Sequence, residues 1–400
     1  MKKLFGKIMA IAVTGALCVG MMMGFAACGD DSGEEGNGFP NLEESKTVKI
    51  GVLVSDVNGD EAKAFRNYYE NYLEKQYKVD FTYTEALEDA AGERSAIETF
   101  AAQGYHAIIS LSASDRAMQI ETCESNKMYY AVASGMLDDS QYEKYKGYEC
   151  FVGQIGPDMA TEYEAGKAMG EYYKTQKEVE KVAIYGAFIP NPMHVYRAAG
   201  ILAGLGLSYG GQTDMGAVVG QIFADQGVTL SKVEGDITVT AYVQGFNPDV
   251  TFGEIGGAVA TSPDAFLSVG MATTFFSSMF AGANVDYADI DAFTAGNVAQ
   301  MSQEGGKLTY LAGKYASSIG PVFAAVYNAV HGNVIKDNGN ALSLGQGYGV
   351  ATTAEAAEKF QTADSGENPI INKALLDTVI GKTVTLETFK AFVAADRTPA

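Results

Sequence analysis

The chain has 400 residues, of which 47% are hydrophobic and 19% are charged, and its 28 basic and 49 acidic side chains give a net charge of −21. This composition is that of a folded globular protein that is long enough for two lobes. The excess of negative charge argues against nucleic acid as a partner, because nucleic-acid binding requires basic patches that neutralise phosphates.

The N-terminus has the layout of an export signal. Three lysines precede an uncharged stretch from residue 8 to 27, and two alanines stand directly before Cys28. This Phe-Ala-Ala-Cys order resembles the bacterial lipoprotein signal, in which the cysteine is lipidated. We therefore expect a signal peptide over residues 1–27 and a lipid on Cys28 that anchors the protein outside the cytoplasm. A plain transmembrane anchor is the alternative, since the apolar run approaches the length of a membrane span.

Residues 28–45 are rich in glycine and acidic residues, so we expect a disordered acidic tether. Two further cysteines, Cys123 and Cys150, belong to the folded part. An exported location permits a disulfide between them, and two buried thiols are the alternative. The three histidines are far apart and show no metal-ligand spacing, so we expect neither a metal nor a cofactor.

Short Val/Ile-rich runs alternate with stretches of helical periodicity from residue 47 onward. The first series predicts strands at 47–55, 79–86, 106–113 and 128–134, with helices at 60–77, 93–103 and 115–126. The pattern restarts with a strand at 148–156, helices at 159–176 and 194–206, and strands at 181–188, 236–244, 265–271, 290–296 and 307–314. Such alternation predicts an α/β fold of two doubly wound lobes with parallel sheets. The uncharged segment 265–285 is read as strand, turn and buried helix, with a membrane span as the alternative.

Three segments carry a family resemblance: "GAFIPNPMHVYRAAGILAGL" (186–205), "GKLTYLAGKYASSIGPVFAAVYNAVHGN" (306–333) and "LSLGQGYGV" (342–350). Together with the export signal, their order resembles the type I periplasmic-binding-protein superfamily, the solute-binding components of ABC importers. The first two segments are similar to the sugar-binding branch. The third leans toward the nucleoside-binding basic-membrane-protein branch.

The resemblance implies two lobes joined by a hinge. We expect the first lobe at residues 46–153, the second at 154–314, a return to the first at 315–347, and a return to the second with a C-terminal tail at 348–400. The chain would cross between the lobes near Gln154, Lys314 and Gly347. Ligands of open α/β sheets bind beyond the carboxyl ends of the strands, so the cleft between the lobes is the expected binding site.

The expected ligand-binding side chains follow from that geometry. Those of the first lobe and the hinges are Asp56, Asn58, Phe65, Ser112, Asp115, Arg116, Ser134, Gln154 and Lys314. Those of the second lobe are Asn191, His194, Arg197, Met271 and Asn297. Asp115 could instead cap a helix. Arg197 could be a solvated helical charge, but it is the strongest candidate because its place matches the arginine of the sugar-binding branch.

The expected function is the capture of a small polar ligand, a sugar or else a nucleoside, and its delivery by a monomer to an ABC permease and its ATPase. A tethered receptor for a signalling partner is a third possibility. The sequence has no Gly-x-Ser-x-Gly elbow or Walker A loop, so we do not expect an enzyme. It also departs from the sugar-binding branch: Ala133 and Ser134 stand where that branch has aspartate and arginine, and Val269 replaces another aspartate.

Overall fold

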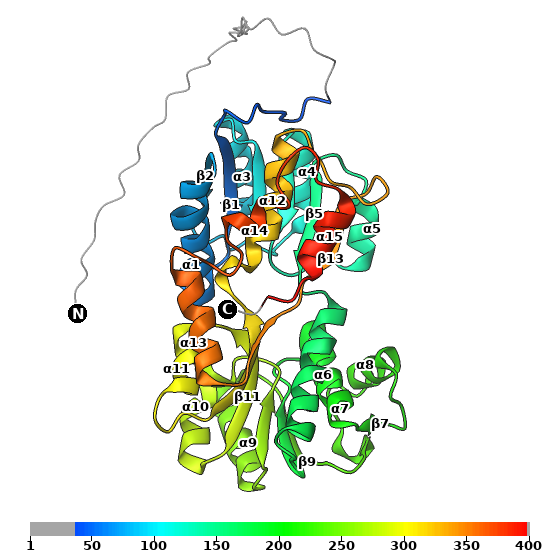
Figure 1. The fold of residues 1–400 in the computed structure, drawn as a ribbon. Coiled ribbons are helices and arrows are strands. Elements are labelled where there is room, and N and C mark those ends of the chain that lie inside the picture. Colours follow the sequence, from blue (N-terminus) through cyan, green and yellow to red (C-terminus); the bar gives the residue numbers. More distant parts are fainter. Residues whose placement is uncertain (1–36, 398–400) are drawn as a thin grey trace, which may run out of the picture. The chain divides into compact units, whose positions relative to one another are not determined.

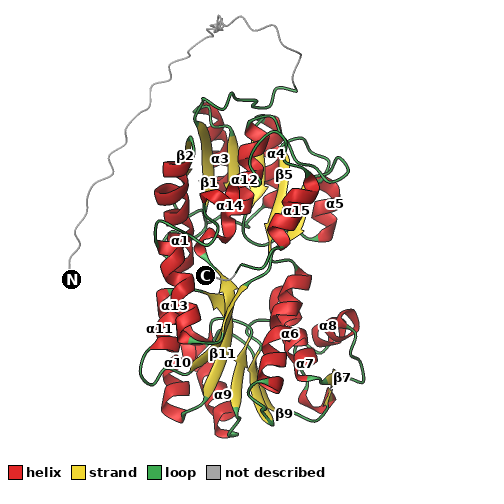
Figure 2. Ribbon diagram, in the orientation of Figure 1, coloured by secondary structure: helices red, strands yellow, loops and turns green. Residues whose placement is uncertain are grey.

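The computed structural model describes residues 37–397, and those from Gly38 onward form one compact unit. Two six-stranded sheets, each covered by helices, make up two lobes of this unit (Figure 1, Figure 2). The expected signal peptide, Cys28 and the first half of the expected tether, up to residue 36, lie outside the described residues.

The first lobe has a parallel sheet in the order β13-β5-β4-β3-β1-β2. Its strands are β1 (Val48–Leu53), β2 (Val79–Tyr83), β3 (Ala107–Ser110), β4 (Tyr129–Val132), β5 (Phe151–Gly156) and β13 (Leu342–Gly345). Its helices are α1 (Asp60–Asn67), which continues through a π-helix (Tyr68–Leu73) into α2 (Glu74–Gln76), then α3 (Ala90–Ala102), α4 (Arg116–Ser125), α5 (Asp139–Tyr145), α12 (Gly320–Val330), α14 (Lys373–Leu376) and α15 (Leu386–Ala394).

The second lobe has a sheet in the order β14-β12-β11-β10-β6-β9, which is parallel except for the β12–β14 pair. Its strands are β6 (Lys181–Tyr185), β9 (Thr238–Val243), β10 (Ala265–Ser268), β11 (Asp286–Ala292), β12 (Leu308–Lys314) and β14 (Gly349–Ala351). Its helices are α6 (Met159–Thr175), α7 (Pro192–Leu205), α8 (Met215–Ala224), α9 (Pro248–Ala260), α10 (Ala272–Ala283), α11 (Ala295–Ser302) and α13 (Ala354–Ser365). A small ribbon, β7 (Ser208–Tyr209) and β8 (Val233–Glu234), and 3₁₀ turns at Leu230–Lys232 and Ala316–Ile319 complete the fold.

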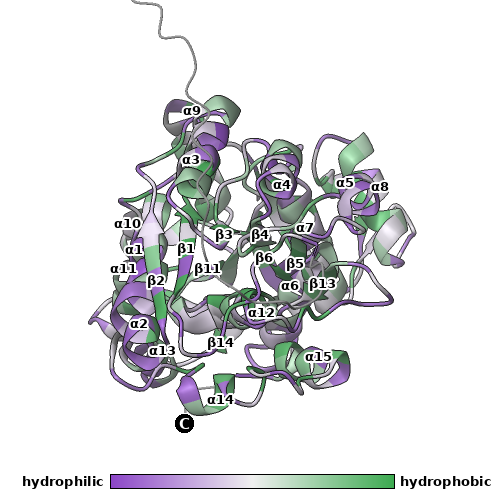
Figure 3. Ribbon diagram, turned by 90° about the horizontal axis from the view of Figure 1, so that it is seen from above, coloured by the Kyte–Doolittle hydropathy of each residue, from purple (hydrophilic) through white to green (hydrophobic). Residues whose placement is uncertain are grey.

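The sequence pattern explains the layers. Strands β3, β4 and β10 are buried at every position, as expected for parallel strands with helices on both faces, and the central strands are coloured as hydrophobic in Figure 3. Aspartates begin several helices by accepting a hydrogen bond from a backbone N–H of the first turn, for example Asp89 before α3 and Asp158 before α6. The predicted α/β class with two doubly wound lobes is confirmed.

The chain passes between the lobes at three places, after β5, after β12 and between β13 and β14. The first crossing begins beyond Gly156, so Gln154 is not a hinge residue but part of β5 within the first-lobe sheet. The C-terminal segment also differs from expectation, because α14 and α15 pack on the first lobe instead of the second. Phe389 and Phe392 provide the apolar contacts that hold α15 in the core of that lobe.

Two further segments differ from the sequence analysis. The strand expected at 290–296 lies at 286–292. Its first half contains Asp286 and Asp289, so a search for an apolar run begins the strand too late, at Ile290. Residues at the end of the expected tether are ordered: Phe39 is buried against Tyr129 with ring centroids 5.3 Å apart, and Leu42 N donates to Val330 O. Their apolar surface explains why this end of the stretch packs on the first lobe.

Candidate ligand-binding site

A cavity of about 360 Å³ lies between the two lobes, at the carboxyl ends of β4, β10, β11 and β12. This is a suitable size for a small ligand. From the first lobe and the first crossing it is lined by Glu61, Leu111, Ala113, Arg116, Ser134, Gly135 and Pro157. From the second lobe and the other crossings it is lined by Glu162, Met193, His194, Arg197, Gly270, Met271, Ile290, Asp291, Lys314 and Tyr348. We call this cavity the cleft.

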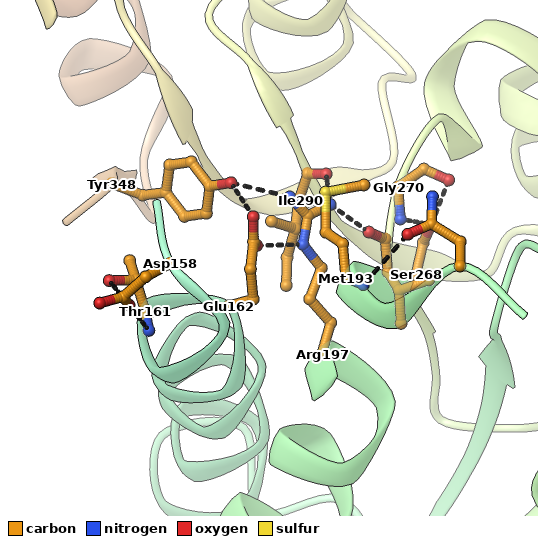
Figure 4. Close-up of polar contacts among 11 residues, drawn as sticks. Asp158, Thr161, Glu162, Met193, Arg197, Ser268, Gly270, Ile290 and Tyr348 are labelled. Carbon is orange, nitrogen blue, oxygen red and sulfur yellow. Dashed lines mark hydrogen bonds and ion pairs between the residues drawn. The ribbon is translucent and has the colours of Figure 1, made fainter. Parts of the chain in front are cut away.

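Arg197 lies at the second-lobe wall of the cleft in a closed network of hydrogen bonds (Figure 4). Its Nε donates to Glu162 Oε2 at 2.6 Å, and its Nη1 donates to the carbonyls of Val269 at 2.6 Å and Ile290 at 3.0 Å. Its Nη2 donates to the Tyr348 hydroxyl at 2.8 Å, and this hydroxyl donates to Glu162 Oε1, also at 2.8 Å. Four of the five N–H groups of a guanidinium are thus occupied, which leaves one for a ligand.

The network shows that Arg197 is not a solvated helical charge, because the residue is only 6% exposed. Burial alone lowers the pKa of Arg197, but Tyr348 and Glu162 outweigh it, so the net pKa is raised and the guanidinium stays charged. Its bonds join α6, α7 and the ends of β10 and β11 to the last crossing segment. Arg197 therefore fixes the wall of the site and presents little free donor capacity to the cleft.

Glycines bring α6 and α7 close enough for the Arg197–Glu162 pair to form. Gly166 and Gly170 on α6 face α7, and Gly200 and Gly204 on α7 face α6. A Cβ at Gly200 would overlap the Tyr163 carbonyl, and one at Gly204 would overlap the Lys167 carbonyl. The two helices therefore touch through their backbones. The signal was present in the sequence as two Gly-x-x-x-Gly spacings, which our sequence analysis did not use.

The first-lobe wall of the cleft carries a second arginine. Arg116, the first residue of α4, donates through Nη1 to Met136 O at 2.8 Å and through Nη2 to Ser134 O. Lys314, the last residue of β12, reaches across from the hinge, where its Nζ donates to Ser134 Oγ at 3.2 Å and lies 3.5 Å from Glu61 Oε1. The structure thus brings together three residues that the sequence analysis proposed: Arg116, Ser134 and Lys314.

Asp291 is the carboxylate of the second-lobe wall that is not paired with Arg197, and the sequence analysis missed it. It lies at the carboxyl end of β11, where Asn297 Nδ2 donates to its Oδ2 at 3.2 Å and to Ala292 O at 2.7 Å. Asn297 therefore positions Asp291, although it does not itself line the cleft. The misplaced strand at 290–296 explains the omission, since it put Asp291 at the wrong end of the strand.

A second carboxyl lies beneath Asp291 on the same strand. Asp289 is fully buried, its Oδ2 accepts from Thr273 N at 3.1 Å, and its Oδ1 has no hydrogen-bond partner among the described residues. Burial, together with the charge of Asp291, raises the pKa of Asp289 to about 8. Burial also raises the pKa of Asp291. Asp289 is therefore mostly protonated at neutral pH.

His194 and Met271 line the cleft on its second-lobe side, as the sequence analysis proposed. His194 Nδ1 lies 3.1 Å from Phe188 N, and burial lowers the pKa of His194 to about 4, so it is neutral. Phe188 and Phe246, which follow β6 and β9, are 47% and 39% exposed, and their rings lie 6.3 Å apart. The Phe246 ring is 6.1 Å from His194. These exposed aromatic rings beside the cleft could have been found as aromatic residues directly after strands.

Six proposed site residues have other positions. Asp115 and Asn191 cap helices, by accepting from Met118 N and Met193 N, so the helix-cap alternative for Asp115 is confirmed. Ser112 is buried and donates to Glu93, and Gln154 is buried between Leu137 N and Ser343 Oγ. Asp56 accepts from the N–H groups of Asn58 and Gly59 in an exposed turn, and Asn58 is exposed in the same turn. None of these six lines the cleft.

Phe65 lines a second cavity of about 330 Å³ beside the cleft. This cavity lies between α1, α13 and the starts of α11 and the 3₁₀ turn after β12, and it shares Glu61 and Lys314 with the cleft. The stacked rings of Phe293 and Phe360, 4.1 Å apart, form part of its wall. The cleft lies at the ends of strands from both lobes, β4 in the first lobe and β10, β11 and β12 in the second, so it is the candidate ligand-binding site.

Cys123 and Cys150 are both buried free thiols in this structure, which agrees with the alternative to a disulfide. Burial raises the pKa of both, so neither is a thiolate at neutral pH. Among residues 37–397, no group of three or more His, Cys, Asp or Glu side chains is arranged to hold a metal ion. In the same range, no helix has both the length and the apolar character of a membrane span.

The described fold is the type I periplasmic-binding-protein fold, and solved structures of ABC-transporter solute-binding proteins share it. One from Bacillus halodurans C-125 with bound myo-inositol has a TM-score of 0.53 and 16% identity over 80% of this chain and 99% of that chain. An arabinose-binding protein from Geobacillus stearothermophilus has a TM-score of 0.55 and 14% identity over 78% of this chain and 99% of that chain. One from Actinobacillus succinogenes 130z with bound D-allose has a TM-score of 0.54 and 13% identity over 78% and 100%.

No protein-family model matches the sequence, and no curated protein matches it either. At these identities the likeness establishes the fold. The predicted type I periplasmic-binding-protein fold, for which the resemblance rested on a few short segments, is confirmed. All three solved structures are binding proteins by their descriptions.

Proposed function

We propose that this protein captures a sugar-like ligand in the cleft and delivers it to an ABC importer. The observation that carries the proposal is the cleft itself, where charged side chains from both lobes and from the hinge segments meet at the carboxyl ends of strands. A ligand that bridges Ser134 and Arg116 to Asp291 and Arg197 would stabilise one arrangement of the lobes. Such differential stabilisation is how a ligand closes a hinged protein.

The chemistry of the wall suits a polyhydroxylated ligand. Hydroxyl groups both donate and accept, and the wall offers the carboxylate of Asp291 as an acceptor and Lys314, Arg116 and one N–H of Arg197 as donors. The Tyr348 hydroxyl is held by Arg197 and Glu162, and the guanidinium carbon of Arg197 lies over the Tyr348 ring, 5.6 Å from its centroid. Phe188 and Phe246 would supply the apolar faces that pack against the C–H groups of a sugar. The bound ligands of two structural neighbours, myo-inositol and D-allose, are of this class.

A lipid on Cys28 and a location outside the cytoplasm belong to the same proposal. Cys28 precedes Phe39, the first residue packed in the first-lobe core, by a short glycine-rich and acidic stretch. Such a stretch would hold the binding lobes close to the membrane in which a permease lies. Metabolic labelling with a clickable palmitate, compared between the wild type and Cys28→Ser, tests the lipid. Label on both proteins or on neither would contradict it.

The ligand class is tested by a thermal-shift screen of the purified protein against monosaccharides, cyclitols, nucleosides and amino acids. A ligand present at 100 times its dissociation constant adds about 2.7 kcal/mol to the stability of the folded state. We expect a raised melting temperature with at least one sugar or cyclitol. A rise with nucleosides alone would replace the sugar by a nucleoside. A folded, ligand-free sample with no rise in any class would contradict the proposal.

A further inference from the structure

Two cationic side chains converge on one residue of the cleft. Arg116 donates to the carbonyl oxygen of Ser134, and Lys314 donates to its hydroxyl oxygen at 3.2 Å. Arg116 belongs to the first lobe and Lys314 ends a strand of the second lobe, so the two charges come from opposite sides of the cleft. We call the region around Arg116, Ser134 and Lys314 the cationic end of the cleft.

The cationic end has fewer ion-pair partners than charges among the described residues. Glu61 is the carboxylate within ion-pair distance of Lys314, at 3.5 Å, and its side chain is 41% exposed. For Arg116, no carboxylate of the described residues lies within ion-pair distance, and its Nε is buried without a hydrogen-bond partner. Of the two cations, Lys314 thus has one partly solvated carboxylate partner and Arg116 has none among the described residues.

Glu93 is the buried acid whose charge acts on Arg116, but its oxygens are already used. It accepts from Ser112 Oγ, from Ser114 N at 3.3 Å and from Asp115 N at 3.1 Å. Burial lowers the pKa of Arg116, which shows the cost of holding this guanidinium away from water. A buried cation is stabilised by an anion that completes its hydrogen bonds.

The rest of the cleft wall carries one ion pair and one further carboxylate. Arg197 and Glu162 neutralise each other there in a 2.6 Å ion pair. Asp291 remains, with the neutral amide of Asn297 as its hydrogen-bond donor. Asp291 neighbours Lys314 across the β11–β12 pair, and no cation of the described residues lies within ion-pair distance of it. A ligand near Ser134 can therefore reach both the two cations and a carboxylate that can accept its hydroxyl groups.

We propose that the ligand is a sugar acid, whose carboxylate binds Arg116 and Lys314 at the cationic end while its hydroxyl groups donate to Asp291. This inference rests on the proposed function, since it names the kind of sugar. The planar fork of a guanidinium matches a carboxylate. A phosphate dianion fits less well, because Glu61 and Asp291 line the same cleft and would repel its second charge.

The test is isothermal titration of the purified protein with matched pairs: glucuronate against glucose, and galacturonate against galactose, with glucose 6-phosphate as a further probe. We expect the acid of at least one pair to bind at least about tenfold more tightly than its neutral partner. Equal or tighter binding of both neutral sugars would overturn the inference and leave the proposed function standing. Tighter binding of glucose 6-phosphate than of glucuronate would overturn the inference that the anionic group of the ligand is a carboxylate. No binding of any sugar would contradict both.

Substitutions of Arg116 test whether this residue causes the preference for a sugar acid over a neutral sugar. Arg116→Gln should bring the acid-to-neutral affinity ratio close to one, and Arg116→Lys, which keeps the charge but not the fork, should give an intermediate ratio. Arg94→Gln removes one charge from an exposed position of α3 in the same lobe and should leave the ratio unchanged. Each ratio compares the affinities of one variant for two ligands. A small loss of stability affects both affinities alike and leaves their ratio unchanged. If Arg116→Gln lacks a folded-state melting transition, Arg116→Lys alone decides; an unchanged ratio in the folded variants overturns the inference.

Discussion

Arg197 and Glu162 form a buried ion pair in which Nε and Oε2 lie 2.6 Å apart and the two side chains are 7% and 4% exposed. Both residues project from helices that touch through glycines, and both bind the hydroxyl of Tyr348 in the last crossing segment. The pair therefore links the packing of the second lobe to the hinge and to the wall of the cleft.

Removing one member of this pair should be costly. Arg197→Ala leaves the Glu162 carboxylate buried without its cation, so we expect a loss of about 3–5 kcal/mol in the free energy of unfolding. Urea denaturation measures it. The matched control is Arg66→Ala, which breaks the exposed pair with Glu70 at 2.9 Å and should cost about 1 kcal/mol or less. Similar losses in the two variants would mean that the Arg197–Glu162 pair is not a buried structural link.

The α6–α7 contact gives a second prediction. Gly200→Ala should destabilise the protein by at least about 1–3 kcal/mol, because its Cβ would overlap the Tyr163 carbonyl and push the helices apart. Gly220→Ala in α8 is the control, since a Cβ there meets nothing within 4 Å. It should be neutral or stabilise by about 0.5–1 kcal/mol through helix propensity. A stable Gly200→Ala variant in thermal unfolding would disprove the backbone contact.

The sequence predicted the two lobes well because their signals are local. Buried strands such as β3 and β10 are short apolar runs, and α6 and α7 have clear helical periodicity. No local sequence pattern shows on which lobe α15 packs, because that choice depends on contacts with residues far away in the sequence. This explains why the C-terminal segment was assigned to the wrong lobe.

The site was predicted in part for the same reason. Strand ends could be found, and they placed Ser134 and Lys314 at the cleft, while the family resemblance placed Arg197 there. The partners of Arg197 could not be found from the sequence, because Glu162 and Tyr348 are 35 and 151 residues away from it in the chain. Short-range patterns likewise do not distinguish a helix-capping aspartate such as Asp115 from one that binds a ligand.

Lys314 should matter for binding more than for folding. Lys314→Gln removes the charge that reaches Ser134 across the cleft, and we expect the affinity for the best ligand of the thermal-shift screen to fall about tenfold or more. The melting temperature without ligand should change little, since the 3.5 Å pair with Glu61 is partly exposed. Lys359→Gln, from an exposed pair with Glu355 on α13, is the control for lost charge. Equal affinities of the two variants would exclude Lys314 from the site.

Phe246 should contribute an apolar face to the bound ligand. Phe246→Ala is expected to weaken sugar binding by about 1–3 kcal/mol. Phe252→Ala provides a comparison, because Phe252 has nearly the same exposure, 38% against 39%, but packs on Phe276. Titration calorimetry of both variants checks the expectation. A larger loss of affinity in Phe252→Ala would place the aromatic contact elsewhere.

Asp289 should make stability depend on pH. Its folded-state pKa of about 8 lies above the ordinary value of 3.8, so the folded protein keeps a proton that the unfolded chain releases. Stability therefore falls as the pH rises from about 4 through 8. Between pH 7 and 8 the loss should be about 1 kcal/mol, in a range where His194, with a pKa of about 4, stays neutral.

Asp289→Asn imitates the protonated carboxyl, so the fall in stability between pH 7 and 8 should largely disappear in this variant. Urea denaturation of the wild type and the variant at both pH values measures the difference. Parallel falls in the two proteins would show that another group, such as the neighbouring Asp291, carries the proton.

The central claim is that a sugar-like ligand binds between the lobes at Asp291, and titration calorimetry of the wild type and Asp291→Asn tests it most directly. The control is Asp236→Asn, which removes an exposed carboxylate just before β9. With the ligand that raises the melting temperature most, we predict saturable binding at one site per chain, at least about tenfold weaker in Asp291→Asn and unchanged in Asp236→Asn. Equal affinity of the wild type and Asp291→Asn, or no binding by the wild type of any sugar or cyclitol, would contradict it.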